Sequence, residues 1–420
     1  MTFEKTLNKT KIATNLSGKN ATFVIVVAIF CISPLIAFPI IIIEILNRKR
    51  YAQTLLSLFM GFAAILWAPT GDLYRHTVEH NEFISSSSTE FIDFLSFRLD
   101  YIYYIFSYLV SKSGINFEIV RFLLVYLVYE LNFYIARNII SRNSTLKKKY
   151  GIIILSFYFS TLFFALTFGL RWTEAAYFTI FGAYQLLVQA RKTGYIWLII
   201  SSLFHFSLTP IAIIIIIINV FKIKTSNLVM VVFAIAVIIL LSPIVLTPII
   251  MNSPIPQSYK TLYSAYISGY WGQEVLTDHS LLYRFSRELR QLLLYPLAIL
   301  VFFLPKCKMA TFARIMFVYV VGCYALSFTL YERYSLIFIF SCLIIVYLSQ
   351  TKISNQLIFL IFCCSLISFC SQIYTFRREF TISSEYLLAA PIPVIVNHHY
   401  STTWINQNIN SDGSGQNLKY

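Results

Sequence analysis

Arginine, histidine and acidic side chains gather in two polar stretches of an otherwise apolar chain. The first offers Asp72, Arg75, His76, Glu79, His80 and Glu82, and the second offers Glu274, Asp278, His279, Arg284, Arg287, Glu288 and Arg290. A guanidinium presents a planar fork of donors that fits a phosphate group with two hydrogen bonds. Carboxylates and histidines can accept a proton from a hydroxyl. This combination favours a site that binds a phosphorylated anion and activates a hydroxyl.

Three arginines of the second stretch, Arg284, Arg287 and Arg290, are spaced three residues apart. Residues three apart lie on the same face of a helix, so the spacing predicts one basic ridge. We interpret the ridge as a grip for an anion such as a lipid pyrophosphate. The alternative is that these arginines pair with nearby acids, such as Glu288, or touch lipid phosphates. Arg333, between two apolar runs, is a further candidate for anion binding.

Two polar residues interrupt apolar segments of the chain. Arg171 breaks an almost continuous apolar stretch from Tyr150 to Ala190, and His205 lies between two phenylalanines. A charge at membrane depth must face a cavity or a partner. For Arg171 the alternative role is an ion pair with Glu174, one helical turn later. For His205 the alternative is a histidine that is hydrogen-bonded to a neighbouring helix.

Asp72 follows Thr70 and Gly71 at the end of an apolar run. As a general base it could accept a proton from a sugar hydroxyl, although a tight turn would also explain an aspartate here. Aromatic residues in segment 259–271 could stack on sugar rings. An aromatic belt at the membrane surface predicts them equally well.

The elements that must position these residues are membrane helices. Of the 420 residues, 58% are hydrophobic and only 12% are charged, whereas soluble domains carry about 25% charged residues. This composition excludes a soluble enzyme, a nucleic-acid-binding protein and a disordered chain. We predict an all-α polytopic integral membrane protein that forms one domain over residues 1–420, with about 10–12 transmembrane helices. The clearest spans are 22–46, 51–69, 117–137, 150–170, 172–190, 228–250, 289–305, 311–330, 334–349 and 355–374.

Two segments do not read as simple spans. Segment 91–110 is aromatic but carries three charges, so its helical spacing predicts an amphipathic helix at the membrane surface. Segment 195–221 is apolar but interrupted by His205 and Pro210, with basic pairs at both ends. We predict a helical hairpin bent near His205, because a hairpin places both basic pairs on one side. Such a break needs burial by other protein or access to water.

Charge predicts most of the topology. The net charge of +15 arises from 33 basic and 18 acidic residues, and most lysines follow from the enrichment of basic residues on the cytoplasmic side. Loop 137–149 holds the strongest basic cluster and is predicted to be cytoplasmic. Counting spans from it puts Arg171, Arg333 and loops 70–116 and 251–288 on the outer face, where we expect the two loops to form the active-site face. The sequence does not predict the orientation of the first span or the location of the C-terminal tail.

Motifs of several other enzyme classes are absent from the sequence. No HExxH, GxSxG or P-loop pattern occurs, and the seven cysteines show no CxxC spacing. All but Cys307 lie inside apolar runs, where cysteine behaves as a small apolar side chain. We therefore expect no metal, no cofactor and no disulfide framework.

The order of motifs resembles the EpsG/Wzy-like family of polysaccharide polymerases over about residues 50–220. The family pattern of a Gly-x-Asp-Tyr-like loop, an acidic residue, an amphipathic helix, Gly and a Phe-led span is matched by Gly71-Asp72-Leu73-Tyr74, Glu90, residues 91–113, Gly114 and Phe117. The "Arg-x-x-x-Ala" element, a basic turn and the "Phe-His-x-Ser" stretch are matched by Arg171 to Ala175, Arg191-Lys192 and Phe204 to Ser207. The chain departs from the family where Trp172-Thr173-Glu174 replaces Gln-Gly-Leu and where Leu73 follows the aspartate.

The resemblance implies a membrane glycosyltransferase that makes O-antigen or capsule at the periplasmic face of the bacterial inner membrane, with a GT-C-like arrangement suggested for its fold. A glycan on undecaprenyl pyrophosphate would move onto a sugar hydroxyl of the next lipid-linked repeat unit, and undecaprenyl pyrophosphate would leave. Its partners would be the lipid-linked oligosaccharide, the bilayer and a chain-length regulator, but no nucleic acid. The catalytic residues would be Asp72 or His205 as base, with Arg171. The substrate-binding residues would be Arg75, Glu174, Arg284, Arg287, Arg290 and Arg333.

Two other functions compete with the polymerase. A flippase for lipid-linked oligosaccharide would place cations along several spans of a central cavity, often in two repeated halves, but the sequence shows no such repeat. A membrane acyltransferase would need a histidine with a nearby acid in a polar loop, for which His279 with Asp278 is a poor candidate. The gathering of charges in two outer loops favours an enzyme over a flippase.

Overall fold

The computed structural model describes residues 21–223, 243–254, 257–267, 269, 280–349 and 354–415. Four of its helices are long and apolar enough to cross a membrane by length and composition. They are α7 (Phe117–Ser141), α20 (Lys308–Leu326), α21 (Phe328–Ser349) and α22 (Asn355–Thr375). The described residues contain no β-strand; an isolated antiparallel β-bridge joins Ile409 to Gly415. The prediction of an all-α polytopic membrane protein is confirmed.

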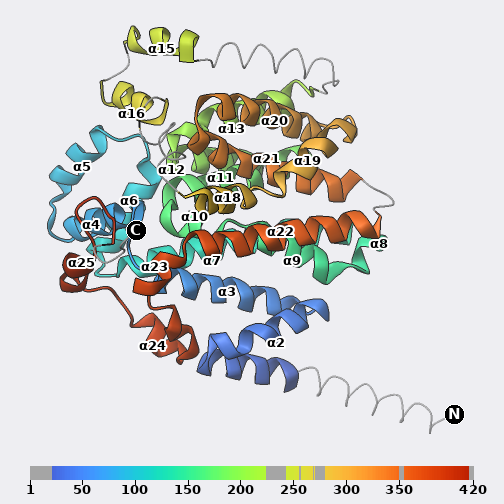
Figure 1. Cartoon of the computed structure of the whole chain (residues 1–420), viewed down its shortest axis with the longest axis horizontal. Helices are drawn as coiled ribbons and strands as arrows, with labels where there is room; N and C mark the ends of the chain where they lie inside the picture. The colour runs from blue at the N-terminus through green and yellow to red at the C-terminus, as the bar shows by residue number, and fades with distance from the viewer. Residues whose placement is uncertain are drawn as a thin grey trace.

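Shorter helices complete the bundle (Figure 1). The apolar ones are Ala21–Ile32, α2 (Pro34–Leu46), α3 (Arg50–Leu66), α9 (Tyr150–Ser160), α10 (Phe163–Phe168), α11 (Leu170–Ala183), α12 (Thr193–Phe204), α13 (Thr209–Val220), α15 (Pro243–Met251) and α19 (Leu294–Leu300). The others are α4 (Asp72–Ser85), α5 (Ser88–Ser96), α6 (Tyr101–Lys112), α8 (Ser144–Lys147), α16 (Gln257–Ile267), α18 (Leu281–Leu289), α23 (Arg377–Ile382), α24 (Ile392–Val396) and α25 (Thr402–Asn408). Short 3₁₀ or π turns extend several of them at 184–188, 206–208, 301–303 and 385–389.

Two predicted spans are each broken into shorter helices. The span 22–46 breaks at Ser33, because Pro34 has no backbone N–H to continue the ladder. The Ser33 side chain caps the new helix by accepting a hydrogen bond from Ile36. The span 150–170 breaks after α9. There the backbone N–H of Leu162, which has no partner within the helix, donates to the hydroxyl of Tyr177 at 3.0 Å. A freed backbone group in a low-dielectric region needs such a partner.

The predicted hairpin is confirmed. The chain turns at His205, between α12 and α13, through a short 3₁₀ turn. Asn219 near the end of α13 donates to the Tyr195 hydroxyl near the start of α12 at 3.0 Å, so both ends of the hairpin lie together. The hairpin packs on α11 at close range: a Cβ added to Gly194 would lie 2.7 Å from the Gly182 carbonyl oxygen.

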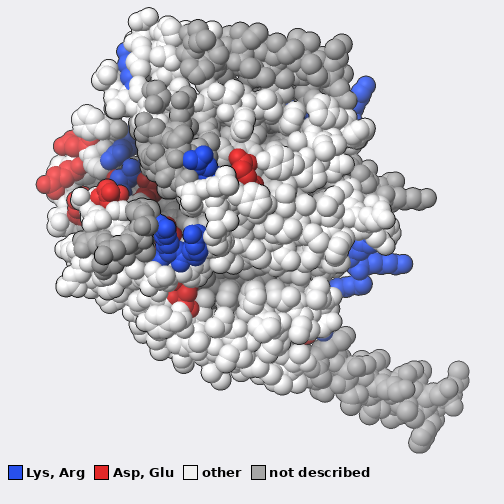
Figure 2. All heavy atoms as spheres, in the orientation of Figure 1, with Lys and Arg blue, Asp and Glu red and all other residues white. Residues whose placement is uncertain are grey.

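The bundle has two chemically different ends. At the basic end, Arg48 donates to the Lys148 carbonyl at 3.3 Å, and Lys308 donates to Asn219 at 2.9 Å, so basic segments meet there in two pairs. The opposite end carries α4, α5 and α6 (Figure 1), and we call it the α4 end. Figure 2 shows that the acidic side chains in view gather mainly around the α4 end.

Two predictions of local structure need correction, and two others fall only partly within the described residues. Segment 91–110 is not one amphipathic helix but parts of α5 and α6, which are separated by a turn that ends at Asp100. Glu332 and Arg333 do not lie between two spans but within the first turns of α21. Of the predicted span 228–250 the structure describes residues 243–250, and of the loop 251–288 it describes residues 251–254, 257–267, 269 and 280–288, so that Asp278 and His279 lie outside the described residues.

The C-terminal segment, residues 376–415, returns to the α4 end. Ser384 donates its backbone N–H to the Leu66 carbonyl at 2.9 Å, and Gly71 donates to the Gly413 carbonyl at 2.8 Å. The Tyr400 hydroxyl donates to the same Leu66 carbonyl at 2.5 Å. These bonds hold the segment on the junction between α3 and α4. The sequence alone does not predict this location.

Candidate functional site

Arg171 lies in the first turn of α11 and pairs with an acid from another element. Its Nη1 donates to Asp100 Oδ2 at 2.9 Å and to the Tyr104 hydroxyl at 2.7 Å. Its guanidinium carbon lies 5.3 Å from the centre of the Tyr104 ring and 5.8 Å from that of Tyr103. An arginine so placed is held by several groups at once, which satisfies the demand that a charge at this depth has partners.

Asp100 connects three parts of the chain. It begins α6, it binds Arg171 of α11, and its Oδ1 accepts the backbone N–H of Phe206 at the hairpin bend at 3.0 Å. Burial raises the pKa of the Asp100 carboxyl, and the charge of Arg171 opposes that rise. Because one carboxylate holds both elements, Arg171 and the neighbouring His205 have fixed positions relative to each other.

A second acid, Glu79 of α4, is close enough to Arg171 for the two charges to interact, and we call the residues around Arg171 at this end the cluster. Its Oε2 lies 3.2 Å from His76 Nδ1, and its Oε1 accepts a hydrogen bond from Arg98 at 3.4 Å. Burial would raise the pKa of Glu79, but the bond from His76 and the charges of Arg171 and Arg98 hold this pKa below its usual value. Glu79 is therefore a carboxylate with a partner on each oxygen.

Only one of the two ring nitrogens of His205, Nδ1, has hydrogen-bond partners among the described residues. The backbone N–H of Ser207 donates to His205 Nδ1 at 3.4 Å, and the Ser207 hydroxyl lies 2.9 Å from the same atom. A backbone N–H can only donate, so Nδ1 is an acceptor and the neutral ring carries its proton on Nε2. Nε2 makes no hydrogen bond within the part of the chain that the structure describes, so it can donate to a ligand oxygen.

Arg333 of α21 is the cation of this cluster without an acidic partner among the described residues. Its guanidinium carbon lies 5.1 Å from the ring centre of Tyr266 on α16 and 5.9 Å from that of Trp172 on α11. The charges of Arg333 and Arg171 both act on the ring of His205. The structure thus brings together Arg171, His205 and Arg333, three residues that are distant in the sequence.

The predicted arginine ridge converges on one acid. Arg287 donates two hydrogen bonds to the Glu332 carboxylate, and Arg290 donates to its Oε1 at 2.6 Å. Glu332 precedes Arg333 on α21, so this ion-pair group adjoins the cluster above. Arg284 lies one turn earlier on α18. Of the two readings of the ridge, pairing with a nearby acid holds for Arg287 and Arg290, although the acid is Glu332 and not Glu288.

Asp72 and Arg75 lie at the start of α4 and pair with each other. Arg75 Nη2 lies 3.2 Å from Asp72 Oδ1, and both side chains are about half exposed, at 51% and 50%. Within the described residues, no hydrogen bond or ion pair joins this pair to Arg171 or His205. The pair stays at the rim of the α4 end, and its proposed roles stay predictions.

Glu174 does not pair with Arg171. The alternative ion pair one helical turn apart is wrong, because Arg171 binds Asp100 instead. Glu174 is fully buried, and neither of its carboxylate oxygens has a hydrogen-bond partner among the described residues. An uncompensated carboxylate inside protein is held in its neutral form, so its predicted binding of an anionic substrate has no support in this position.

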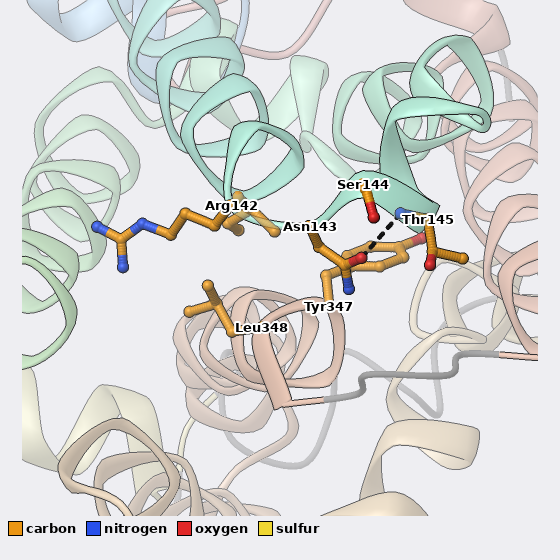
Figure 3. Close-up of a pocket in the computed structure, with 7 residues that line it drawn as sticks. Arg142, Asn143, Ser144, Thr145, Tyr347 and Leu348 are labelled. Carbon is orange, nitrogen blue, oxygen red and sulfur yellow. Dashed lines mark hydrogen bonds between the residues drawn. The ribbon is translucent and has the colours of Figure 1, made fainter.

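A cavity of about 320 Å³ lies at the basic end, away from the cluster. It is bordered by the turn that joins α7 to α8 and by the end of α21 (Figure 3). Figure 3 shows Asn143, Ser144 and Thr145 along one side and Tyr347 and Leu348 along the other. The cavity contains Arg142 but no acid or histidine, so it does not offer the proton-transfer groups that the α4 end does.

Reasoning from the sequence identified Arg171, His205 and Arg333 but missed Asp100, the acidic partner of Arg171, and the nearby Glu79. Asp100 and Arg98 were noted only as charges that are costly in an aromatic segment, and Glu79 and His76 only as members of a polar stretch. The signal that could have singled out Asp100 is this cost, because a lone acid among aromatic residues needs a buried cation. No spacing rule links residue 100 to residue 171.

Comparison with known proteins gives one match. A family model described as the EpsG family matches residues 71–388, which is more than half of the chain. The matched range runs from the start of α4 through the helices that carry Asp100, Arg171, His205 and Arg333. Searches of curated proteins and of solved structures each found no match.

Proposed function

The chain belongs to the EpsG family of Wzy-like polysaccharide polymerases, and we propose that it extends a surface polysaccharide by transferring a lipid-linked glycan onto the next lipid-linked repeat unit. The donor would be a glycan on undecaprenyl pyrophosphate, and the acceptor a sugar hydroxyl of a second such lipid. The bond between the anomeric carbon and the pyrophosphate oxygen breaks as the hydroxyl oxygen bonds to that carbon. The product is an O-antigen or capsule chain.

The observation that carries the proposal is the position of Arg333 beside His205 and Arg171. Arg171 is bound to Asp100, whereas Arg333 contacts aromatic rings and has no acidic partner among the described residues. A cation that is not neutralised by protein is available to an anion, and the proton on His205 Nε2 adds a neutral donor. Donors held in place before the reaction stabilise charge that builds on a leaving pyrophosphate.

The role of each predicted residue follows from its surroundings. We assign pyrophosphate binding to Arg333 and His205, with Arg171 fixing the geometry and contributing charge. Because Arg287 and Arg290 are both bound to Glu332, they position α18 against α21 more than they hold substrate. Asp72 and Arg75 at the rim would meet the polar glycan. Glu174 is too deeply buried to join them.

The α4 end would face the periplasm and the basic end the cytoplasm. Basic turns from several parts of the chain meet at one end, as expected for cytoplasmic loops. The cluster of acids, histidines and arginines lies at the other end. In bacteria this orientation places the reaction at the outer surface of the inner membrane, with a chain-length regulator as a further partner there.

The alternative function, a flippase, would need cations along the interior of the bundle so that a pyrophosphate could cross. Among the described residues, the ion pair of Arg171 lies at the α4 end, whereas the buried Arg121 and Arg314 on the bundle helices donate to backbone carbonyls and Arg137 pairs with Glu130. Because these interior cations are already held by protein groups, the arrangement supports a reaction at the α4 end over passage of a pyrophosphate through the protein. The acyltransferase alternative rests on Asp278 and His279, which lie outside the described residues.

A gel of surface polysaccharide from a strain that lacks the protein tests the proposal. Loss of a polymerase leaves a single repeat unit on the carrier, so we expect the ladder of long chains to collapse to one band. Complementation with the Arg171→Ala variant should give the same single band, because both the ion pair with Asp100 and the charge beside His205 are lost. A strain without any surface glycan would indicate a flippase, and a full ladder would indicate an acyltransferase. Long chains made by Arg171→Ala at normal protein level would remove Arg171 from the mechanism.

A further inference from the structure

Two histidines on α4, one turn apart, are both buried but differ in how their ring nitrogens are used. His76 is 2% exposed and His80 is 1% exposed. His80 Nε2 lies 3.1 Å from the Ile115 carbonyl and Nδ1 lies 3.0 Å from the Ser107 hydroxyl, so both nitrogens have partners. A ring satisfied at both ends has a structural role.

His76 has a partner on one nitrogen only. Its Nδ1 lies 3.2 Å from Glu79 Oε2, and a carboxylate can only accept, so the proton is on Nδ1. Nε2 therefore carries a lone pair, and it makes no hydrogen bond within the described residues. A histidine that donates from Nδ1 to a carboxylate and leaves Nε2 open has the arrangement of a general base.

The surroundings of His76 suit this role. The ring packs edge-on against Tyr103 of α6, with centroids 5.1 Å apart, which fixes its orientation. Arg98 binds the second oxygen of Glu79, and its side chain is 40% exposed, so the pair is linked to the surface of the α4 end. The charge of Arg171 acts on His76, which places the ring in the same cluster as the proposed pyrophosphate-binding residues.

The charged and titratable groups around His76 are Glu79 and Arg75 on its own helix, Arg171 on α11, His205 at the hairpin bend and the Tyr103 ring on α6. Burial lowers the pKa of His76, and the charges of Arg171 and Arg75 lower it further, while Glu79 acts in the opposite direction. The ring is therefore neutral at pH 7, as a base must be before it accepts a proton. Its activity should be lost only when the pH falls below the usual histidine pKa of about 6.5.

We propose that His76 is the general base that activates the acceptor hydroxyl, with Glu79 as its positioning residue. This inference rests on the proposed function. The acceptor O–H gives its proton to His76 Nε2 while its oxygen bonds to the anomeric carbon of the donor. The electron pair of the broken bond leaves with undecaprenyl pyrophosphate. The imidazolium that forms is stabilised by Glu79 and later loses its proton to water. This assignment replaces Asp72 and His205 as the base.

The test measures polymer formation by purified full-length protein in vesicles supplied with an undecaprenyl-pyrophosphate-linked repeat unit. A general base contributes about 10²–10⁴ in rate, so His76→Ala should lose about that factor, and added imidazole should restore part of the activity. The wild-type rate should fall on the acidic side of pH 6.5, and His76→Gln, which cannot gain a proton, should lack this fall.

The matched control is His80→Ala. Any loss of activity in this variant comes from packing, so imidazole should not restore the rate. The decrease of the rate below pH 6.5 should remain, because His76 is still present.

Other outcomes overturn the assignment. If His76→Ala retains more than about a tenth of the wild-type rate, or if imidazole restores neither His76→Ala nor a stably folded His76→Asn variant, His76 is not the base. His76→Asn keeps a donor towards Glu79, so it separates loss of the base from loss of folding. Wild-type protein that makes no polymer refutes the proposed function itself, whereas active wild-type protein with a fully active His76→Ala refutes this inference alone.

Discussion

At the scale of single residues, the α4 end is organised by carboxylates that each hold more than one partner. Asp100 binds Arg171 and the hairpin bend, Glu79 binds His76 and Arg98, and Glu332 binds two arginines. A charge removed from water is stable only when its partners are in place. Each acid therefore fixes the geometry of cations that come from other elements.

The shared acid Glu332 gives a prediction for stability. Replacing it with Gln keeps its size but removes the carboxylate charge that pairs with the buried guanidiniums of Arg287 and Arg290. We expect a loss of about 3–5 kcal/mol in the free energy of unfolding, because breaking a buried ion pair leaves an uncompensated charge. Thermal unfolding in detergent measures the change.

The matched control for this prediction is Glu288→Gln on α18, the helix that also carries Arg287. Glu288 accepts a hydrogen bond from Tyr295 at 2.9 Å in an exposed position, so we expect a change within about 0.5 kcal/mol. If Glu332→Gln and Glu288→Gln unfold at the same temperature, the two arginines do not depend on Glu332.

Individual residues of the candidate site could be predicted from their types, but the pairs that they form could not. Arg171 and His205 could be singled out because polar residues in apolar segments are costly, and both lie in the cluster. The partners of Arg171 could not be predicted, because the turn that brings Asp100 to it depends on how α6 packs against α11 and α12. Spacing offered Glu174 as an alternative partner for Arg171, and the packing of α6 gives Arg171 to Asp100 instead.

At the scale of elements, hydrophobic length predicted where helices lie but not where they break. The predicted span 150–170 is largely apolar, yet helix α9 ends within it, with Thr161 as its C-cap. The Tyr177 hydroxyl of α11 accepts a hydrogen bond from the freed backbone N–H of Leu162. The hairpin at His205 could be predicted, because the basic pairs at its two ends and Pro210 are local signals. A break stabilised by a distant side chain leaves no local signal.

The docking of the C-terminal segment gives a prediction at this scale. Gly413 has a φ of +84°, and a Cβ there would lie 2.8 Å from the Gly71 carbonyl oxygen. We expect Gly413→Ala to weaken docking by about 1–3 kcal/mol, from backbone strain together with the clash. Limited proteolysis should then cut residues 397–415 about tenfold faster, since cleavage follows the population of the open form.

Gly114→Ala is the control for this variant. Gly114 also has a positive φ, +67°, but nothing lies within 4 Å of an added Cβ. This change adds strain without a clash and lies outside the C-terminal segment, so the rate at which that segment is cut should not change. Equal cleavage of both variants and wild type would mean that the Gly71–Gly413 contact does not hold the segment.

At the scale of the whole molecule, the two ends of the bundle account for the two populations of charge in the sequence. Among the described residues, basic turns such as those of Lys148 and Lys308 lie at the basic end, whereas Figure 2 shows acidic and further basic side chains around the α4 end. The positive-inside rule predicted the first population. The second, which includes Arg333 without an acidic partner among the described residues, is the part that suggests binding of a pyrophosphate.

The most direct measurement is polymer formation by the purified protein in vesicles that contain an undecaprenyl-pyrophosphate-linked repeat unit. We predict that wild-type protein makes a ladder of long chains and releases undecaprenyl pyrophosphate. Arg333→Ala should be at least about 10²-fold slower, because one donor to the leaving group is lost. Arg142→Ala, at the cavity of the opposite end, should match wild type. Wild-type protein that makes no polymer, or equal rates for the two arginine variants, would contradict the account.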